Sequence, residues 1–217
     1  MKATESQRGH QSRADQDPAS PLGRRAFLAM VGVATGAVTV LTAGQSFPGL
    51  RGTNVFGPRD GTGPQGLPVN KTAASAEVES AAADPGWRLR VGSPAGMMSW
   101  SRDGLLALPQ TEVDLPIACV EGWSASAHWS GVRLRDLLAA VGASSAAGVR
   151  VTSLQPRGAY RVVDMGPEFA QHEATLVALA VNGQTLDLDH GFPARMIAPN
   201  RPGVLQTKWL QQIEVLT

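Results

Sequence analysis

The chain has 217 residues, 43% of them hydrophobic, which is enough for one sizeable core. Met1–Leu50 carries five Lys/Arg and three Asp/Glu, which leaves 14 and 15 for Arg51–Thr217, so the body lacks the basic surface of a nucleic-acid-binding protein. With 24 glycines, 15 prolines and 17% charged residues, a coiled coil is excluded. The single cysteine, Cys119, excludes an intramolecular disulfide.

The N-terminal part has the pattern of a targeting segment. Residues 1–22 are polar without an apolar period and are expected to be disordered. In residues 23–46, Arg24 and Arg25 directly precede an uncharged run whose apolar part, Ala26–Ala43, is 18 residues long. This pattern resembles a twin-arginine export signal, and the alternatives are a buried helix or a plain membrane anchor.

The location of the folded part follows from this segment. No convincing small-x-small cleavage site is present, so cleavage and retention as an anchor both stay open. Either outcome predicts export across the cytoplasmic membrane, with the domain on its outer face or in the periplasm, and with membrane contact through this helix if it is uncleaved. Residues 47–63 are rich in glycine and proline and are predicted to be a linker, followed by one domain over 64–217.

The first half of that domain contains short, separated elements. Trp87–Val91 alternates apolar and basic residues and is typical of a half-buried strand. Ser99 or Ser101 is suited to cap a short helix that ends before Pro109. Leu115–Val120 is predicted to be a buried strand with a proline near its start.

The second half begins with a clear amphipathic helix. Leu134, Leu137, Leu138 and Val141 lie at helical spacing, and Gly142 suits the C-terminal cap. Asn182-Gly183 then favours a two-residue hairpin turn. Strands are predicted at Val149–Leu154, Leu176–Val181, Gln184–Leu188, Ala194–Ala198 and Trp209–Leu216. About six or seven short strands with two helices indicate an α+β domain with a mixed, mainly antiparallel, β-rich sheet arrangement.

Three segments together resemble the molybdenum-cofactor domain of the sulfite oxidase family. They are PQGLPVN at residues 64–70, LPIACVEGWSASAHWSGVRLRDLL at residues 115–138, and LDLDHGFPARMIAPNRPGVLQTKWLQQIEVL at residues 186–216. The resemblance implies a sulfite oxidase-type fold and an oxidoreductase with a molybdenum–molybdopterin cofactor, performing two-electron chemistry of the oxygen-atom-transfer type. It also implies that Cys119 is the catalytic residue and ligates the metal, which suits a soft thiolate ligand.

The same resemblance implies which residues bind the pterin. His190 and Arg195 match the family's His-x-x-x-x-Arg pattern, and Gln206, Thr207 and Lys208 match a turn that closes over the cofactor. Guanidinium and ammonium groups are chemically suited to the phosphate that the pterin carries. Two further cofactor-binding residues, Gln65 and Asn70, are implied by the first segment.

The sequence departs from true sulfite oxidases after the cysteine. Those enzymes place an arginine there to hold sulfite, whereas here none occurs between Cys119 and Arg133. Glu121 and Trp123 are more similar to the exported bacterial branch, which includes periplasmic methionine sulfoxide reductase catalytic subunits. We therefore expect a small-molecule or oxidised side-chain substrate and a membrane-bound or soluble haem-type redox partner. Candidates for the pocket wall are Trp123, His128, Trp129 and Tyr160.

Two other classes of function stay open. Cys119 could act as the nucleophile of a thiol enzyme, with His128 or His190 as the base. The domain could also be a non-catalytic exported binding module of the same fold. A zinc site is disfavoured because none of the four histidines has HxxxH or related spacing.

Overall fold

The computed structural model describes residues 26, 28–33, 35, 63–118 and 124–216. The chain divides into two units, Met1–Asn54 and Val55–Thr217. In the first unit all described residues are helical, and no helix in the described part of the chain is long and apolar enough to span a bilayer. The predicted disordered lead, the Arg24–Arg25 pair and the predicted linker up to residue 62 lie outside the described residues.

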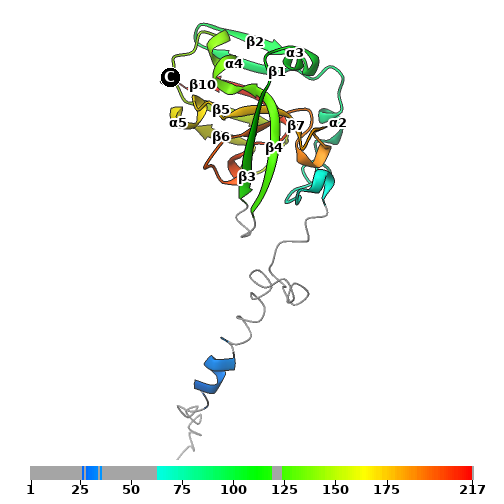
Figure 1. Cartoon of the computed structure of the whole chain (residues 1–217), viewed down its shortest axis with the longest axis vertical. Helices are drawn as coiled ribbons and strands as arrows, with labels where there is room; N and C mark the ends of the chain where they lie inside the picture. Colours follow the sequence, from blue (N-terminus) through cyan, green and yellow to red (C-terminus); the bar gives the residue numbers. More distant parts are fainter. Residues whose placement is uncertain (1–25, 27, 34, 36–62, 119–123, 217) are drawn as a thin grey trace, which may run out of the picture. The chain divides into compact units, whose positions relative to one another are not determined.

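The second unit is an α+β fold built on two sheets (Figure 1). One sheet has the strand order β2-β1-β10-β5-β6, and the other has the order β3-β4-β7-β8 with β9 also paired to β7. Only β1 and β10 pair in parallel among the described strands, so the mixed, mainly antiparallel arrangement is confirmed. The strands are β1 (Leu89–Ser93), β2 (Gly96–Trp100), β3 (Thr111–Ala118), β4 (Ser124–Arg133), β5 (Val149–Ser153), β6 (Val162–Met165), β7 (Leu176–Val181), β8 (Gln184–Thr185), β9 (Arg195–Ile197) and β10 (Leu210–Val215).

The helices of this unit are short; η2 and α2 precede β1, and the others lie in the connections between strands. They are η2 (Pro64–Gly66), α2 (Glu79–Ala82), α3 (Arg102–Leu106), α4 (Leu134–Ala140), α5 (Pro167–Ala170), η3 (Leu188–His190) and η4 (Gly203–Leu205). In α4 the predicted apolar stripe is buried, with Leu134, Leu137 and Leu138 each at most 1% exposed. Ser101 caps α3 by accepting a hydrogen bond from the Gly104 N–H at 3.0 Å, as the sequence predicts for one of its two candidate caps.

The main hydrophobic core joins the two sheets and α4. It combines Val91 and Ile213 of the first sheet with Val177 and Met196 of the second. A second cluster, which includes Leu67, Trp129 and Ile197, also involves β7 through Leu176, Ala178 and Val181. The strand β7 is therefore covered on both faces, which explains why its sequence is an unbroken apolar run rather than an alternating one.

Several predicted elements differ in extent from those observed. β3 begins at Thr111, earlier than predicted, because its first half alternates and turns Glu112 and Asp114 to solvent. The ten-residue strand β4 beside it was not predicted, since its small residues and the register shift at Ser130/Gly131 obscure the period of two (Figure 1). The strands β2 and β6 were also not predicted. The Asn182-Gly183 hairpin is confirmed, with φ of 49° and 74°.

Candidate functional site

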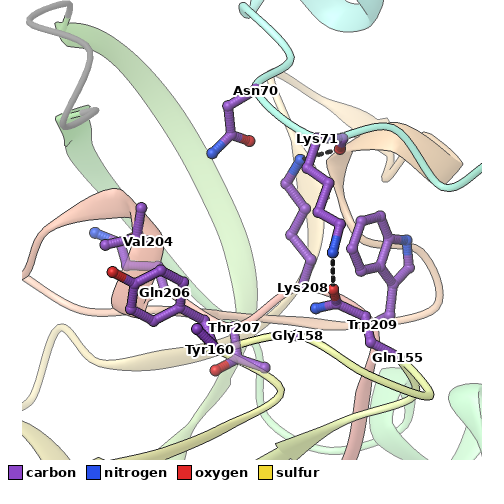
Figure 2. Close-up of a pocket in the computed structure, with 11 residues that line it drawn as sticks. Asn70, Lys71, Gln155, Gly158, Tyr160, Val204, Gln206, Thr207, Lys208 and Trp209 are labelled. Atoms are coloured by element: carbon purple, nitrogen blue, oxygen red, sulfur yellow. Dashed lines mark hydrogen bonds between the residues drawn. The ribbon is translucent and has the colours of Figure 1, made fainter. Parts of the chain in front are cut away.

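A cavity of about 120 Å³ opens where three segments of the second unit meet (Figure 2). These segments are the stretch after η2, the connection between β5 and β6, and the stretch that runs from η4 into β10. Its lining residues are Asn70, Lys71, Gln155, Gly158, Ala159, Tyr160, Val204, Gln206, Thr207, Lys208 and Trp209. The structure thus brings together four predicted cofactor-binding residues that are as much as 138 positions apart: Asn70, Gln206, Thr207 and Lys208.

Two lysines form one wall of this cavity. Figure 2 shows their side chains extending past one another: the Lys71 ammonium donates to the Gln155 side-chain oxygen, and Lys208 Nζ donates to the Lys71 carbonyl at 3.0 Å. Lys208 Nζ also donates to the Asp189 carbonyl at 2.7 Å and lies 5.3 Å from the centre of the Trp209 ring. Both side chains end in an ammonium group, so this wall of the cavity carries positive charge.

The opposite wall carries buried polar atoms that lack partners. Gln206 Oε1 and Thr207 Oγ1 are inaccessible to solvent and form no hydrogen bond with the described residues. Gln206 is oriented by its own amide, which donates to the Arg201 carbonyl at 2.8 Å. A buried polar group without a partner is costly, and a bound ligand with donors and acceptors removes that cost. The unpartnered acceptor Gln206 Oε1 fits an N–H donor such as those of a pterin ring, and the ammonium groups of the lysines fit its phosphate.

Arg195 and His190 lie in the adjacent interior and do not line this cavity. Arg195 is fully buried, donates to the His190 carbonyl at 3.0 Å, and its guanidinium carbon lies 4.9 Å from the Trp129 ring centre. Burial lowers the pKa of Arg195 to about 9, so the group is still a cation at neutral pH. Its Nε is buried and forms no hydrogen bond with the described residues, and such a donor fits an anionic group.

His190 connects η3 to the N-terminal segment of the domain. Its Nε2 lies 2.7 Å from the Pro64 carbonyl, to which it donates. Desolvation lowers the pKa of His190. The positive charges of Arg195 and Lys208 lower it further, whereas the hydrogen bond to Pro64 raises it. Gly191 follows with φ of 107°, and a Cβ there would lie 3.2 Å from the Lys208 Cβ, so this turn packs directly on the lysine.

Gln65 has a bridging position outside the cavity. Its side chain donates to the Thr185 carbonyl at 2.7 Å and accepts from the Asp187 N–H at 3.1 Å. Asn182 donates to the Gln65 carbonyl at 2.9 Å, so η2 is joined to the hairpin of β7 and β8. These contacts give Gln65 a role in fixing the segment that leads to Asn70.

The predicted metal ligand, Cys119, and the pocket candidate Trp123 lie outside the described residues. The strand that leads to Cys119 does meet the cavity loop, because a Cβ on Gly203 would lie 2.8 Å from the Ala118 carbonyl oxygen. Two motifs are therefore in contact at Ala118 and Gly203, which are 85 positions apart in the sequence. Within the described residues no cluster of three His, Cys, Asp or Glu side chains could hold a metal ion.

The remaining pocket candidates have different surroundings. Tyr160 lines the cavity and is half exposed. Trp129 is buried under Arg195, whereas His128 is half-exposed on β4, 3.0 Å from the Asp114 carboxylate. That hydrogen bond raises the pKa of His128.

Sequence reasoning missed Lys71 and Gln155 as residues of the site. Gln155 follows β5 and Lys71 follows η2, and only the tertiary fold brings them together. One signal was available for Lys71, since it directly follows Asn70, a predicted cofactor-binding residue. Gln155 offers no such signal in a single sequence.

Comparison with known proteins identifies the domain. The sequence model of the family described as "oxidoreductase molybdopterin binding domain" matches residues 75–217. The chain belongs to this family. Molybdenum with molybdopterin is accordingly its cofactor, and the predicted class of molybdopterin-dependent oxidoreductase is confirmed.

Individual relatives support the same family. The chain is 35% identical over 143 residues to the "Putative protein-methionine-sulfoxide reductase subunit YedZ1" of Azospira oryzae, covering 64% of this chain and 51% of that protein. It is 28% identical over 158 residues to mitochondrial sulfite oxidase of Rattus norvegicus, covering 58% of this chain and 28% of the other. Both matches leave about half or more of the relative's length uncovered.

A solved structure has the same fold. The sulfane dehydrogenase SoxCD from Paracoccus pantotrophus aligns with a TM-score of 0.54 at 20% identity, over 60% of this chain and 38% of that one. This match confirms the predicted sulfite oxidase-type α+β fold.

Proposed function

We propose that this chain is an exported molybdopterin-dependent oxidoreductase that removes an oxygen atom from an oxidised sulfur, in a small molecule or a methionine side chain. The observation that carries the proposal is the cavity between the lysine pair and the buried, unpartnered polar atoms of Gln206 and Thr207. The names of the relatives quoted above support chemistry at sulfur.

This chain's own residues would bind and orient the cofactor. Gln206 and Thr207 would supply hydrogen bonds, and Lys71 and Lys208 positive charge, at the cavity wall. Arg195, behind them, would balance the phosphate charge from the buried side. We assign Cys119 as the thiolate ligand of the metal, because it is the chain's only cysteine and a soft ligand. When bound, molybdenum with molybdopterin supplies the two-electron redox step.

The direction of the reaction is proposed to be reduction. A sulfoxide takes up two electrons and two protons and yields a thioether and water. The electrons would come from a membrane-bound or soluble haem-type redox protein. Reduction is favoured over sulfite oxidation because no arginine stands between Cys119 and Arg133 to hold a sulfite anion.

The test begins with the natively exported protein and its Cys119→Ser variant. Molybdenum and pterin per chain are measured first, with about one of each expected in the wild type. Methionine sulfoxide reduction is then followed with a reduced viologen dye, and sulfite oxidation with ferricyanide. Sulfoxide reduction lost in Cys119→Ser supports the proposal, because an alcohol is a poor, hard substitute for a thiolate.

Three outcomes would overturn parts of it. A wild-type protein without molybdenum that still turns over in a cysteine-dependent manner would establish a thiol enzyme. Bound molybdenum without turnover of either substrate would point to a non-catalytic binding module. Sulfite oxidation faster than sulfoxide reduction would reverse the proposed direction.

A further inference from the structure

Arg201 lies in the loop between β9 and η4, within the third motif segment but outside the cavity lining, and the resemblance implies no role for its side chain. Its side chain is buried, with only 7% of the residue exposed. Its Nη2 donates to the Asp164 carbonyl of β6 at 2.7 Å, and its guanidinium carbon lies 5.2 Å from the centre of the Phe169 ring in α5. These two contacts fix the guanidinium to the first sheet and its following helix.

The same residue closes the loop that follows it. Arg201 Nε donates to the Leu205 carbonyl at 3.1 Å, and the Arg201 carbonyl accepts from the side-chain amide of Gln206 at 2.8 Å. Within the loop, the backbone N–H groups of Leu205 and Gln206 donate to the Pro202 and Gly203 carbonyls at 2.9 and 3.1 Å. Residues 201–206 thus form a small closed loop, the 201–206 ring, in which Arg201 at the first end is hydrogen-bonded to Leu205 and Gln206 at the other end.

This ring meets the site on two sides. Val204 and Gln206 line the cavity, and Gly203 packs on the end of β3, where an added Cβ would lie 2.8 Å from the Ala118 carbonyl oxygen and 3.0 Å from Ile117 Cγ2. A shift of the ring would therefore move the cavity wall and the end of β3 together.

We propose that Arg201 is a positioning residue of the cofactor site, which fixes the 201–206 ring so that Gln206 and the end of β3 keep their spacing. The link to cofactor binding rests on the proposed function. The hydrogen bonds by which Arg201 holds the ring, here called the clamp, form within the protein, so their effect on the ring can be measured without cofactor.

The experiment compares Arg201→Met and Arg201→Lys with a matched control, Arg150→Met. Arg150 binds the same residue as Arg201, but through the Asp164 carboxylate on the solvent-exposed face, at 2.8 Å from both Nε and Nη2. The control therefore removes an arginine contact to β6 without touching the ring. Methionine keeps most of the buried volume of Arg201, and lysine keeps the charge but cannot bridge both carbonyls.

The first readout is amide hydrogen exchange of Leu205 and Gln206 in cofactor-free protein, and the second is molybdenum and pterin per chain. Arg201→Met should speed exchange at these amides about tenfold or more, as expected for losing a charge-assisted hydrogen bond, and should lower cofactor occupancy. Arg201→Lys should give a smaller increase in exchange and a partial recovery of occupancy. Arg150→Met should leave both unchanged.

Unchanged exchange and full occupancy in either Arg201 variant would overturn the proposal. Equal changes in Arg150→Met would also overturn it, because they would trace the effect to β6 and not to the ring. If Arg201→Met fails to fold, the exchange rates of the Leu205 and Gln206 amides and the cofactor content of Arg201→Lys test the proposal instead. A wild type without molybdenum whose ring still loosens in the Arg201 variants would refute the proposed function and leave the clamp standing.

Discussion

Arg195 is a fully buried guanidinium with no carboxylate partner among the described residues. Burial of a charge without an opposite charge costs several kcal/mol, even with one carbonyl acceptor and an aromatic face nearby. A residue that is unfavourable for the empty protein and favourable for a bound anion indicates a binding role. We therefore expect Arg195 to bind an anionic ligand rather than to have a purely structural role.

Arg195→Met should weaken cofactor binding and leave the melting temperature of the cofactor-free protein unchanged or higher. The lost contact is worth about 1.5–3 kcal/mol, which corresponds to roughly tenfold to more than a hundredfold in affinity. Methionine occupies a similar volume without a buried charge. Molybdenum per chain and the apoprotein melting temperature are the measurements. If Arg195→Met kept a full molybdenum content but its apoprotein had a lowered melting temperature, Arg195 would instead be a structural residue.

His190 and His128 have pKa shifts of opposite sign. Desolvation lowers the pKa of His190 from its ordinary 6.5. Between that value and the lowered one, the unfolded chain holds a proton that the folded chain does not, so the free energy of unfolding falls as pH drops below 6.5. The Asp114 hydrogen bond raises the pKa of His128, so its stabilisation is full below 6.5 and lost as pH rises through the raised pKa.

His190→Gln should therefore reduce the loss of stability between about pH 7 and pH 5.5, whereas His128→Gln should increase it. Urea unfolding of the cofactor-free protein at both pH values measures the difference for each variant. The His128 effect should be the smaller, because that side chain is exposed and water screens the pair. A pH dependence in His190→Gln equal to that of the wild type would refute the assignment of a neutral, buried histidine.

At the scale of elements, the pairing of β4 with β7 depends on a glycine. A Cβ built on Gly131 would lie 2.2 Å from the Val177 carbonyl oxygen and 2.6 Å from the Ala178 Cα. These atoms belong to the backbone of a central strand and cannot move aside cheaply. The register shift between Ser130 and Gly131 lies at the same place, so the close approach and the bulge share one cause.

Gly131→Ala should destabilise the domain by about 3 kcal/mol, the upper end of the usual cost of overpacking. Gly96→Ala in β2 is the control, because nothing lies within 4 Å of its added Cβ, and it should change stability by less than about 0.5 kcal/mol. Denaturant unfolding of both variants is the measurement. Equal effects in the two would show that backbone freedom, and not the contact with β7, is the reason for glycine at 131.

Features that depend on a few neighbouring residues could be predicted from the sequence. The Asn182-Gly183 turn, the stripe of α4 and the Ser101 cap are local, and all are present. β4 could not be predicted, because its character as a strand comes from pairing with β3 and β7. Likewise Gln206 was predicted from a motif, whereas Gln155 reaches the cavity only through tertiary contacts. The roles of the predicted site residues stay predictions.

At the scale of the whole chain, the arginine pair at 24 and 25 remains a predicted export signal. Arg24→Lys with Arg25→Lys should block export and leave cofactor-loaded protein in the cytoplasm, because the twin-arginine route carries folded proteins. Cell fractionation with immunoblotting measures the distribution. Arg13→Lys is the control and should be exported normally. Unchanged export of the double variant would contradict the assignment.

The parallel pairing of β1 with β10 bears on when the domain can fold. β10 lies between β1 and β5, so a strand that is synthesised after all the other described strands occupies the middle of the first sheet. A nascent chain that has not yet released Val215 therefore leaves β1 and β5 each with an unpaired edge. The cavity residues 204–209 also emerge just before this strand. The first sheet can then be completed only after Val215 has left the ribosome, and any passage through a membrane as a folded protein must come later still.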